Sequence, residues 1–246
     1  MPLPNINAKL LVIVPTYNEN KNVEELVENL DNLELNLDIL FVDGQSNDGT
    51  QESIRSLIKS GSEHVHLLVE SKKTGLANAY LAGFHWAVSN NYDFVIQMDC
   101  DGSHRTSDLV RMVNKIEPNT LVLGSRYICG GSSSGWNKKR VVLSYCANLF
   151  IKFFLVVNIS DMTTGFKVLP RNAILDILKD QIQSVGYSFQ IEVNLKCKVK
   201  GYNLVEIPIT FVDRQHGSSK LNFRIISEAL RLIFKWKFQY KLTEAE

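Results

Sequence analysis

The chain contains 246 residues, of which 45% are hydrophobic and 22% are charged, and its formal net charge is +1. This composition excludes wholesale disorder, and the length favours one globular domain with a sizeable core. The balanced charge provides no overall attraction to nucleic acid, so an anionic ligand would have to be recognised by local clusters of cations.

The sequence lacks the patterns of export and membrane insertion. The N-terminal residues have neither the basic nor the apolar region of a secretory signal peptide. The most apolar stretch, residues 141–159, is interrupted by polar side chains and falls short of the run of about 20 apolar residues that spans a bilayer. The four cysteines form no CxxC pair and no zinc-type spacing with histidine. We therefore expect a cytoplasmic protein with free thiols.

Apolar runs alternate with helical periodicities over the first half of the chain. Strands are predicted at residues 10–14, 39–42, 65–69, 94–98 and 121–123. Helices are predicted at residues 23–33, 50–58, 77–88 and 109–116. This alternation predicts an α/β sandwich with a mostly parallel central sheet flanked by helices, in which ligands bind at the carboxyl ends of the strands.

The pattern changes after residue 125. Residues 130–135 are rich in glycine and serine and predict a flexible loop, and an apolar helical segment follows to residue 159. Residues 204–211 alternate like a strand, and residues 221–240 predict a final amphipathic helix. No internal repeat is visible. We therefore expect a main domain over residues 1–220 and a C-terminal helix with its tail over residues 221–246.

Polar side chains follow three predicted strands at the ends where such a sheet binds ligands. Residues 16–18 follow the first strand, residues 43–46 the second, and Asp99 and Asp101 the fourth. In an extended chain, residues two apart point to the same side, so these two carboxylates converge. Such oxygen ligands suit Mg²⁺ or Mn²⁺ and leave positions for diphosphate oxygens. The pair alone fits a surface turn with helix-capping acids equally well, and its place beside the other clusters favours a metal site.

Two loops combine cations with small residues. Residues 72–75 precede the helix that begins near Ala77, and a helix N-terminus attracts phosphate, although a solvated lysine pair is the commoner explanation. Arg214 and Lys220 enclose a segment of small residues before the final helix, which suggests a loop that folds over phosphates.

Residues 119–160 contain no acidic side chain but include Arg126 and Arg140. Basic side chains around a glycine- and serine-rich loop could hold an anionic acceptor, with about 1.5–3 kcal/mol for each desolvated charged contact. A solvated basic face is the alternative. It is less usual beside an apolar helix that is rich in aromatic residues.

The final predicted helix has a basic face and an apolar face. Between residues 214 and 241 there are seven cations and one acid, Glu228. A basic face opposite Trp and Phe side chains is typical of helices at a membrane surface. The alternative is that the apolar face packs on the protein's own core. No recognised nucleic-acid-binding module is visible, so nucleic acid is not an expected partner.

Taken together, these segments resemble the inverting family-2 glycosyltransferases of GT-A fold, and among them the dolichol-phosphate mannose synthases. The resemblance runs from about residue 10 to residue 221. Its motifs are VPTYNE at 14–19, MDCD at 98–101, GSRY at 124–127, TGFK at 164–167, GYSFQIE at 186–192 and the GSSKL ending of residues 214–221.

The resemblance implies a Rossmann-like GT-A catalytic domain in residues 1–220 that transfers mannose from GDP-mannose to a polyprenyl phosphate such as dolichyl phosphate, with inversion. The implied nucleotide-binding residues are Pro15, Tyr17, Glu19, Asp43 and Asp99. The implied catalytic residues are Asp99, Asp101, Arg126 and Arg140, of which the two aspartates would hold Mg²⁺ or Mn²⁺. The implied phosphate- and acceptor-binding residues are Arg126, Arg140, Arg214 and Lys220.

The lipid acceptor implies a membrane location. We expect peripheral attachment to the cytoplasmic face through residues 141–159 and the final helix, or docking to a small membrane subunit. One alternative is a family-2 transferase that uses a UDP-sugar or a hydroxyl acceptor. However, a hydroxyl acceptor needs a carboxylate base, and the arginines favour a phosphate. Another alternative is a non-catalytic nucleotide-sugar-binding membrane partner, which metal-dependent turnover would exclude.

Overall fold

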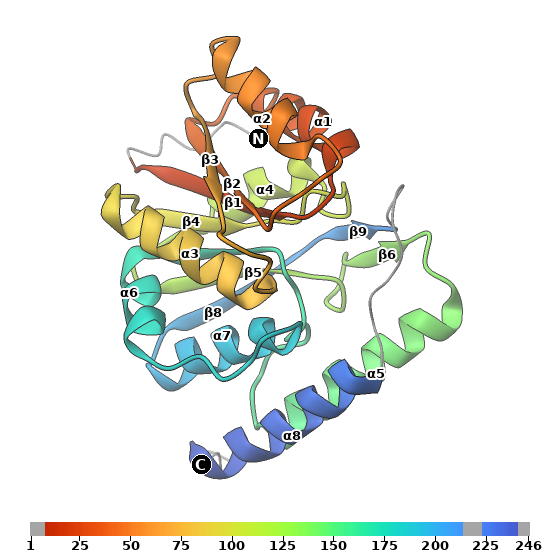
Figure 1. Cartoon of the computed structure of the whole chain (residues 1–246). Helices are drawn as coiled ribbons and strands as arrows, with labels where there is room; N and C mark the ends of the chain where they lie inside the picture. Colours follow the sequence, from red (N-terminus) through yellow and green to blue (C-terminus); the bar gives the residue numbers. More distant parts are fainter. Residues whose placement is uncertain (1–7, 214–222, 241–246) are drawn as a thin grey trace.

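A computed structural model describes residues 8–213 and 223–240. Seven strands form the main sheet in the order β3-β2-β1-β4-β7-β5-β8, and β6 pairs with β9 in a separate ribbon (Figure 1). The strands are β1 Leu10–Thr16, β2 Leu37–Asp43, β3 Val65–Val69, β4 Phe94–Gln97, β5 Thr120–Ser125, β6 Ser132–Ser134, β7 Lys167–Pro170, β8 Asn203–Pro208 and β9 Thr210–Val212. The helices are α1 Asn20–Asp31, α2 Thr50–Lys59, α3 Leu76–Ser89, α4 Thr106–Val113, α5 Lys138–Phe154, α6 Arg171–Lys179, α7 Ser188–Val199 and α8 Phe223–Gln239.

The main sheet separates two hydrophobic cores. Side chains of α1, α2 and α4 pack on one face, and those of α3, α6 and α7 pack on the other. All neighbouring strands are parallel except β7, which runs antiparallel to β4 and β5. The predicted α/β sandwich with a mostly parallel sheet is therefore confirmed. Its physical basis is that continuous apolar strands need helices on both faces to exclude water.

The strand register brings the predicted polar clusters to one edge. Thr16 of β1 lies opposite Asp43 of β2, and Ile13 of β1 lies opposite Gln97 of β4. Because β7 is antiparallel, its first residue, Lys167, pairs with the last residue of β4. The segment before β7 therefore approaches the same edge of the sheet as the segment after β4.

Three expectations for the second half of the chain were wrong in detail. The predicted strand 204–211 is interrupted at Ile209, so that β8 joins the main sheet and β9 joins the ribbon. The segment predicted as a flexible loop contains β6, which pairs with β9. Residues 155–159, which we expected to be helical, follow the end of α5 at Phe154, and Val156 has a φ of 53° that a helix cannot include.

Helices α5 and α8 lie side by side at one end of the molecule (Figure 1). The rings of Phe154 and Phe234 are 4.6 Å apart between the two helices. One face of α8 joins the core beside α3, α6 and α7 through Leu232, Ile233 and the fully buried Trp236. The alternative expectation, that the apolar face of this helix packs on the protein's own core, is therefore confirmed for these side chains, and another face carries exposed apolar side chains. No helix in the described part of the chain has the length and apolar character needed to cross a membrane.

Candidate active site

The turns after β1 and β2 are built around the carboxylate of Asp43, which has no exposed surface. Its Oδ2 accepts hydrogen bonds from Thr16 Oγ1 at 3.1 Å and Ser46 Oγ at 2.5 Å. Its Oδ1 accepts from the Ser46 amide at 2.9 Å and from Gln51 Nε2 at 2.7 Å. These four donors fill the carboxylate. A nucleoside contact by Asp43 would therefore have to replace one of them.

The segment that follows β1 presents the other predicted nucleotide-binding residues. Pro15 lies within β1, and the ring of Tyr17 lies beneath Lys73, whose Nζ is 3.1 Å from the ring centroid. Glu19 accepts a hydrogen bond from Asn22 Nδ2 at 2.5 Å. Lys73, the second lysine of the 72–75 loop, thus lies over an aromatic ring in a favourable cation–π geometry. The contact brings the loop before α3 to the same edge as β1.

Asp99 and Asp101 follow β4 on the loop that leads to α4. The Oδ1 atom of Asp101 accepts from the Ser103 amide at 3.1 Å, and the Asp99 amide donates to His104 Nδ1 at 3.1 Å. These bonds fold the loop tightly, so that both carboxylates stay near the strand end. The described residues contain no group of three or more His, Cys, Asp or Glu side chains that could hold a metal ion. A cation on the two aspartates would therefore take further ligands from substrate or water.

The surroundings of the aspartate pair fit a hard divalent cation. The phenol of Tyr80 is fully buried, and its pKa is raised well above the ordinary value by burial and then by the charges of Asp99 and Asp101. A divalent cation held by the two carboxylates would add positive charge beside this buried ring, and carboxylate oxygens are the ligands that Mg²⁺ and Mn²⁺ prefer. Burial, together with the nearby carboxylates, also raises the pKa of the Cys100 thiol well above its usual value. Cys100 therefore stays a neutral thiol that fills space in the core beneath α1.

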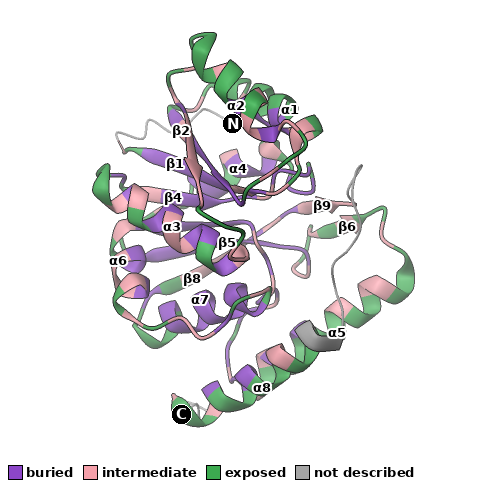
Figure 2. Cartoon of the chain, viewed as in Figure 1, coloured by how far each residue is buried: buried purple, intermediate pink, exposed green. Residues whose placement is uncertain are grey.

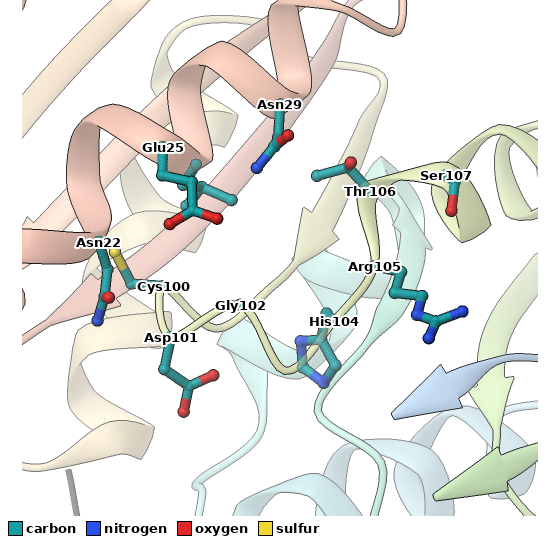
Figure 3. A pocket seen from close by; sticks show the side chains of 11 residues that line it. Asn22, Glu25, Asn29, Cys100, Asp101, Gly102, His104, Arg105, Thr106 and Ser107 are labelled. Atoms are coloured by element: carbon teal, nitrogen blue, oxygen red, sulfur yellow. The ribbon is translucent and has the colours of Figure 1, made fainter. Parts of the chain in front are cut away.

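A cavity of about 250 Å³ lies between α1 and this loop (Figure 3). Of the predicted site residues, only Asp101 lines it. The remaining lining includes Asn22, Glu25 and Asn29 on successive turns of α1 and Arg105 on the loop. This cavity is thus on the α1 side of the aspartate loop. The other predicted nucleotide residues do not border it.

The two predicted acceptor arginines lie against one tryptophan. The guanidinium carbon of Arg140 is 3.9 Å from the Trp136 ring centroid, and that of Arg126 is 5.4 Å from it. Each arginine also has a carboxylate partner: Asp161 binds Arg126 at 2.7 Å, and Asp213 binds Arg140 at 2.9 Å. The structure therefore brings together two cations that are 14 positions apart in the sequence. A planar guanidinium pair of this kind suits a phosphate.

Aromatic contacts connect the aspartate loop to the arginine pair. The ring of His104 stacks on Phe166 at 4.9 Å and meets the edge of Phe211 at 5.4 Å. Phe211 in turn contacts the Trp136 ring at 5.3 Å. Since His104 accepts the hydrogen bond from the Asp99 amide, an unbroken series of contacts runs from Asp99 to the arginines. These contacts connect the loop that carries the predicted metal residues to the predicted acceptor arginines.

Several of these residues were not identified from the sequence. They are His104, Trp136, Asp161, Phe211 and Asp213. His104 follows the aspartate pair by three positions and Trp136 lies in the acid-free region, so both had a detectable signal. The carboxylates that pair with the arginines gave none, because their partners lie 35 and 73 positions away. The remaining predicted residues, Arg214 and Lys220, lie outside the described residues.

Curated relatives cover almost the whole chain. A polyprenol monophosphomannose synthase from Mycolicibacterium smegmatis is 36% identical over 96% of this chain and 90% of that protein. An undecaprenyl-phosphate mannosyltransferase from Micrococcus luteus is 34% identical over 93% of both chains.

Solved structures share the fold at low sequence identity. A mannosyltransferase from Pyrobaculum calidifontis, solved with GDP-mannose and Mn²⁺, matches with a TM-score of 0.67 and 19% identity over 97% of this chain and 66% of that one. Glucosyl-3-phosphoglycerate synthase from Mycobacterium tuberculosis, solved with UDP, gives a TM-score of 0.64 and 13% identity over 97% and 82% of the two chains. The model of the family described as "Glycosyl transferase family 2" matches residues 11–178. The chain therefore belongs to glycosyl transferase family 2 and is a glycosyltransferase of GT-A fold.

Proposed function

We propose that this enzyme transfers mannose from GDP-mannose to a polyprenyl phosphate, with inversion at the anomeric carbon and release of GDP. The named activities of the 34–36% identical relatives support the lipid phosphate acceptor and the sugar. The observation that carries the proposal is the continuity between the Asp99–Asp101 loop and two arginines on one tryptophan ring. In this proposal, the two aspartates would hold a cation for the leaving diphosphate, and the two arginines would bind the attacking phosphate.

The donor would bind at the ends of β1, β2 and β4. Pro15, Tyr17, Glu19 and Asp43 would hold the nucleoside. Asp99 and Asp101 would hold Mg²⁺ or Mn²⁺, which when bound supplies positive charge to the leaving diphosphate. Lys73 lies close enough to Tyr17 to add a further positive charge on this side. Arg214 and Lys220, which the sequence predicts as phosphate-binding residues, would close over the diphosphate.

The acceptor phosphate would bind between Arg126 and Arg140. A phosphate monoester is already an anion near neutral pH, so the attack needs no strong general base. The chain therefore has to position the phosphate in line with the leaving group and balance charge on both sides of the sugar. Arg126 is suited to this role because Asp161 holds its guanidinium in one orientation.

The lipid chain of the acceptor would enter from an apolar platform, which we define as the exposed apolar side chains of α5 and α8. They are Val142, Leu143, Tyr145, Leu149, Phe150 and Phe153 on α5, and Ile226, Leu230, Phe234 and Phe238 on α8. In Figure 2, exposed residues recur along both helices. A shallow apolar groove of about 550 Å³ lies on the α5 part of this platform, beside Phe150 and Phe153.

Charge around the apolar platform favours an anionic lipid surface. Exposed Lys138, Lys139, Arg231 and Lys235 flank it, and α5 contains no acidic residue. Apolar area and flanking cations together are what binds a helix to an anionic bilayer. We therefore propose peripheral attachment to the cytoplasmic face of a membrane, with residues 221–246 as the docking helix and tail of the 1–220 catalytic domain. The alternative is that a small membrane subunit binds these side chains, in which case the enzyme would bind membranes that contain the subunit but not pure lipid vesicles.

Transfer of labelled mannose from GDP-mannose into organic-extractable lipid, with polyprenyl phosphate and Mg²⁺ or Mn²⁺, tests the proposal. We expect a metal-dependent lipid product. A product obtained only with a UDP-sugar would contradict the donor. A product formed only on hydroxyl acceptors would contradict the role of the arginines. Binding of GDP-mannose without turnover, in a fully folded preparation supplied with membranes, would favour a non-catalytic binding protein.

A further inference from the structure

The single acidic residue of α8, Glu228, contacts a loop of the main domain. Its Oε1 accepts hydrogen bonds from Ser188 Oγ at 3.0 Å and from the Val185 amide at 3.3 Å. A Cβ atom placed on Gly186 would lie 3.9 Å from its Oε2, so the backbone of the loop lies close along the carboxylate. Among the described residues, the hydrogen-bond partners of Glu228 are thus Val185 and Ser188, in the segment that leads into α7.

The base of the same loop is held by a second carboxylate. Glu192 of α7 is fully buried and accepts from the Gln183 amide at 3.0 Å and the Ser184 amide at 2.9 Å. Ser184 Oγ adds a bond of 2.5 Å to the same side chain. Residues 183–184 are therefore fixed to α7 from within the main domain. Residues 186 and 187 accept backbone hydrogen bonds from α7, whereas the Val185 amide and Ser188 Oγ donate to Glu228, which comes from the helix that carries part of the apolar platform.

The far side of the loop caps the N-terminus of α3. The Val185 carbonyl accepts a hydrogen bond from the Ala77 amide at 3.4 Å, and α3 has no side-chain cap of its own. A Cβ on Gly75 would lie 3.4 Å from the same carbonyl oxygen, and Gly75 has a φ of +100°. A residue with a side chain would be strained at that φ, so glycine permits this turn into α3. The amide of Val185 is thus bonded to α8, and its carbonyl is bonded to α3.

The first turns of α3 lie against the donor side of the site. Lys73, two residues before Gly75, lies over the ring of Tyr17. Tyr80 lies one turn further along α3 and is close enough to Asp99 and Asp101 to interact with their charges. Its ring stacks on that of Phe189, with 5.8 Å between the ring centroids. A displacement of the α3 N-terminus would therefore move a cation on the nucleoside side and a ring beside the aspartate pair together.

We propose that Glu228 is a positioning residue that couples the seating of α8 to donor binding, through residues 185–188 and the N-terminus of α3. The proposal deepens the proposed function and rests on it, because it takes α8 to be the docking helix and the α3 side to be the donor side. The consequence is that, when α8 is docked on lipid, residues 185–188 and the N-terminus of α3 keep the donor site in the conformation that binds GDP-mannose. When the Glu228 contact is broken, the donor site is less ordered and its affinity for GDP-mannose is lower.

The test compares Glu228→Ala with Glu228→Gln, with steady-state kinetics on polyprenyl phosphate in vesicles. We expect Glu228→Ala to raise KM for GDP-mannose about fivefold or more, as the loss of two hydrogen bonds to a charged acceptor implies. KM for the lipid and flotation with vesicles should stay within about twofold, since this carboxylate contacts neither. Glu228→Gln keeps an acceptor oxygen and should recover most of the donor affinity. Ser188→Ala removes one of the two bonds and should give an intermediate increase.

Glu28→Ala is the matched control, because it removes an exposed acid from α1, on the opposite face of the sheet. It should leave both KM values unchanged. An unchanged donor KM in folded Glu228→Ala would overturn the proposal, as would a Glu228→Gln variant as impaired as Glu228→Ala. An increase confined to the lipid KM would also overturn it.

Hydrogen exchange provides a readout that does not need turnover. In the wild type, GDP with Mn²⁺ should slow exchange of the Ala77 and Val185 amides, and Glu228→Ala should lose most of this protection while Glu228→Gln keeps it. Equal protection in all three proteins would contradict the coupling. A wild type that shows the protection but transfers no mannose would contradict the proposed function and leave the coupling supported.

Discussion

Arg126 and Asp161 form a buried bidentate ion pair, with Nε to Oδ2 at 2.7 Å and Nη2 to Oδ1 at 2.8 Å. Nη2 also donates to Thr163 Oγ1 at 2.8 Å, and the Arg126 amide donates to Asp161 Oδ2. Among the described residues, the side-chain bonds of Arg126 use only Nε and Nη2. Asp161 therefore fixes the orientation of the arginine, and Nη1 is the nitrogen that the proposed acceptor phosphate would contact.

Removal of the charge on Asp161 should destabilise the protein strongly. Asp161→Asn leaves a buried guanidinium without a counter-charge, which costs about 3–5 kcal/mol of the free energy of unfolding. Urea denaturation measures this loss. The matched control is Asp213→Asn, which breaks the more exposed pair with Arg140 and should cost less than about 1 kcal/mol. Equal losses in the two variants would contradict the structural role of the buried pair.

The same pair should make stability fall in acid. Burial alone would raise the pKa of Asp161, but the charge and hydrogen bonds of Arg126 outweigh it and lower the pKa. The stabilisation is therefore complete above the unfolded value of about 3.9 and is lost as the pH falls through the lowered native pKa. Denaturation between pH 5 and pH 2 should show this loss in the wild type and a smaller one in Asp161→Asn.

Lys167 should make stability rise with pH above neutrality. Its side chain is fully buried, and this burial lowers its pKa to about 7. Between that value and about 10.4 the unfolded chain binds more protons than the folded one, so the free energy of unfolding increases with pH. Relative to Lys167→Met, we expect a gain of about 2 kcal/mol between pH 7 and pH 9. Parallel stability curves for the two proteins would contradict a neutral buried amine.

Trp136 should support acceptor binding without affecting the donor. Trp136→Ala removes the ring on which both arginines lie, and a loss of about 1.4 kcal/mol of cation–π stabilisation corresponds to about a tenfold higher KM for polyprenyl phosphate. Trp136→Phe keeps an aromatic face and should recover part of the affinity. The KM for GDP-mannose serves as the internal control. A change confined to the donor KM would place the ring in another role.

Asp101 should be essential for transfer and dispensable for folding. Asp101→Ala, and Asp101→Asn with its uncharged oxygen, should abolish mannose transfer because the cation loses a ligand charge. Asp101→Asn still offers an acceptor to the Ser103 amide, so thermal unfolding should change little. Asp93→Asn, at the opposite end of β4, is the control and should keep activity. Transfer by a folded Asp101 variant would refute the assignment of the cation site.

The apolar platform should mediate binding to lipid. Phe153 and Phe238 are 70% and 77% exposed, and their replacement by serine should reduce flotation with anionic vesicles severalfold. Ile58→Ser, which changes an exposed apolar residue on α2, should float as the wild type does. Unchanged flotation of the double variant would contradict attachment through α5 and α8. If the double variant binds pure lipid vesicles as the wild type does but fails to bind a membrane extract, the platform contacts a protein subunit of the membrane.

Elements with a local hydrophobic pattern could be predicted from the sequence. β1, β2 and β4 are continuous apolar runs, and the polar residues after them end at one edge of a parallel sheet, so Asp43, Asp99 and Asp101 could be placed without tertiary information. Local periodicity did not reveal α7, because ten of its twelve residues are buried and it therefore has no solvent-facing stripe. Neither did it reveal β7, which is only four residues long.

Contacts between side chains that are distant in the sequence became known only from the three-dimensional fold. Arg140 and Asp213 are 73 positions apart, and Ser188 and Glu228 are 40 apart, so no local pattern records either contact. The interruption at Ile209 moves β9 into a second sheet, which places Phe211 between His104 and Trp136. Such contacts depend on how sheets and helices pack in three dimensions. Chain-local hydrophobicity fixes the elements, and packing then decides the partners of the charged groups.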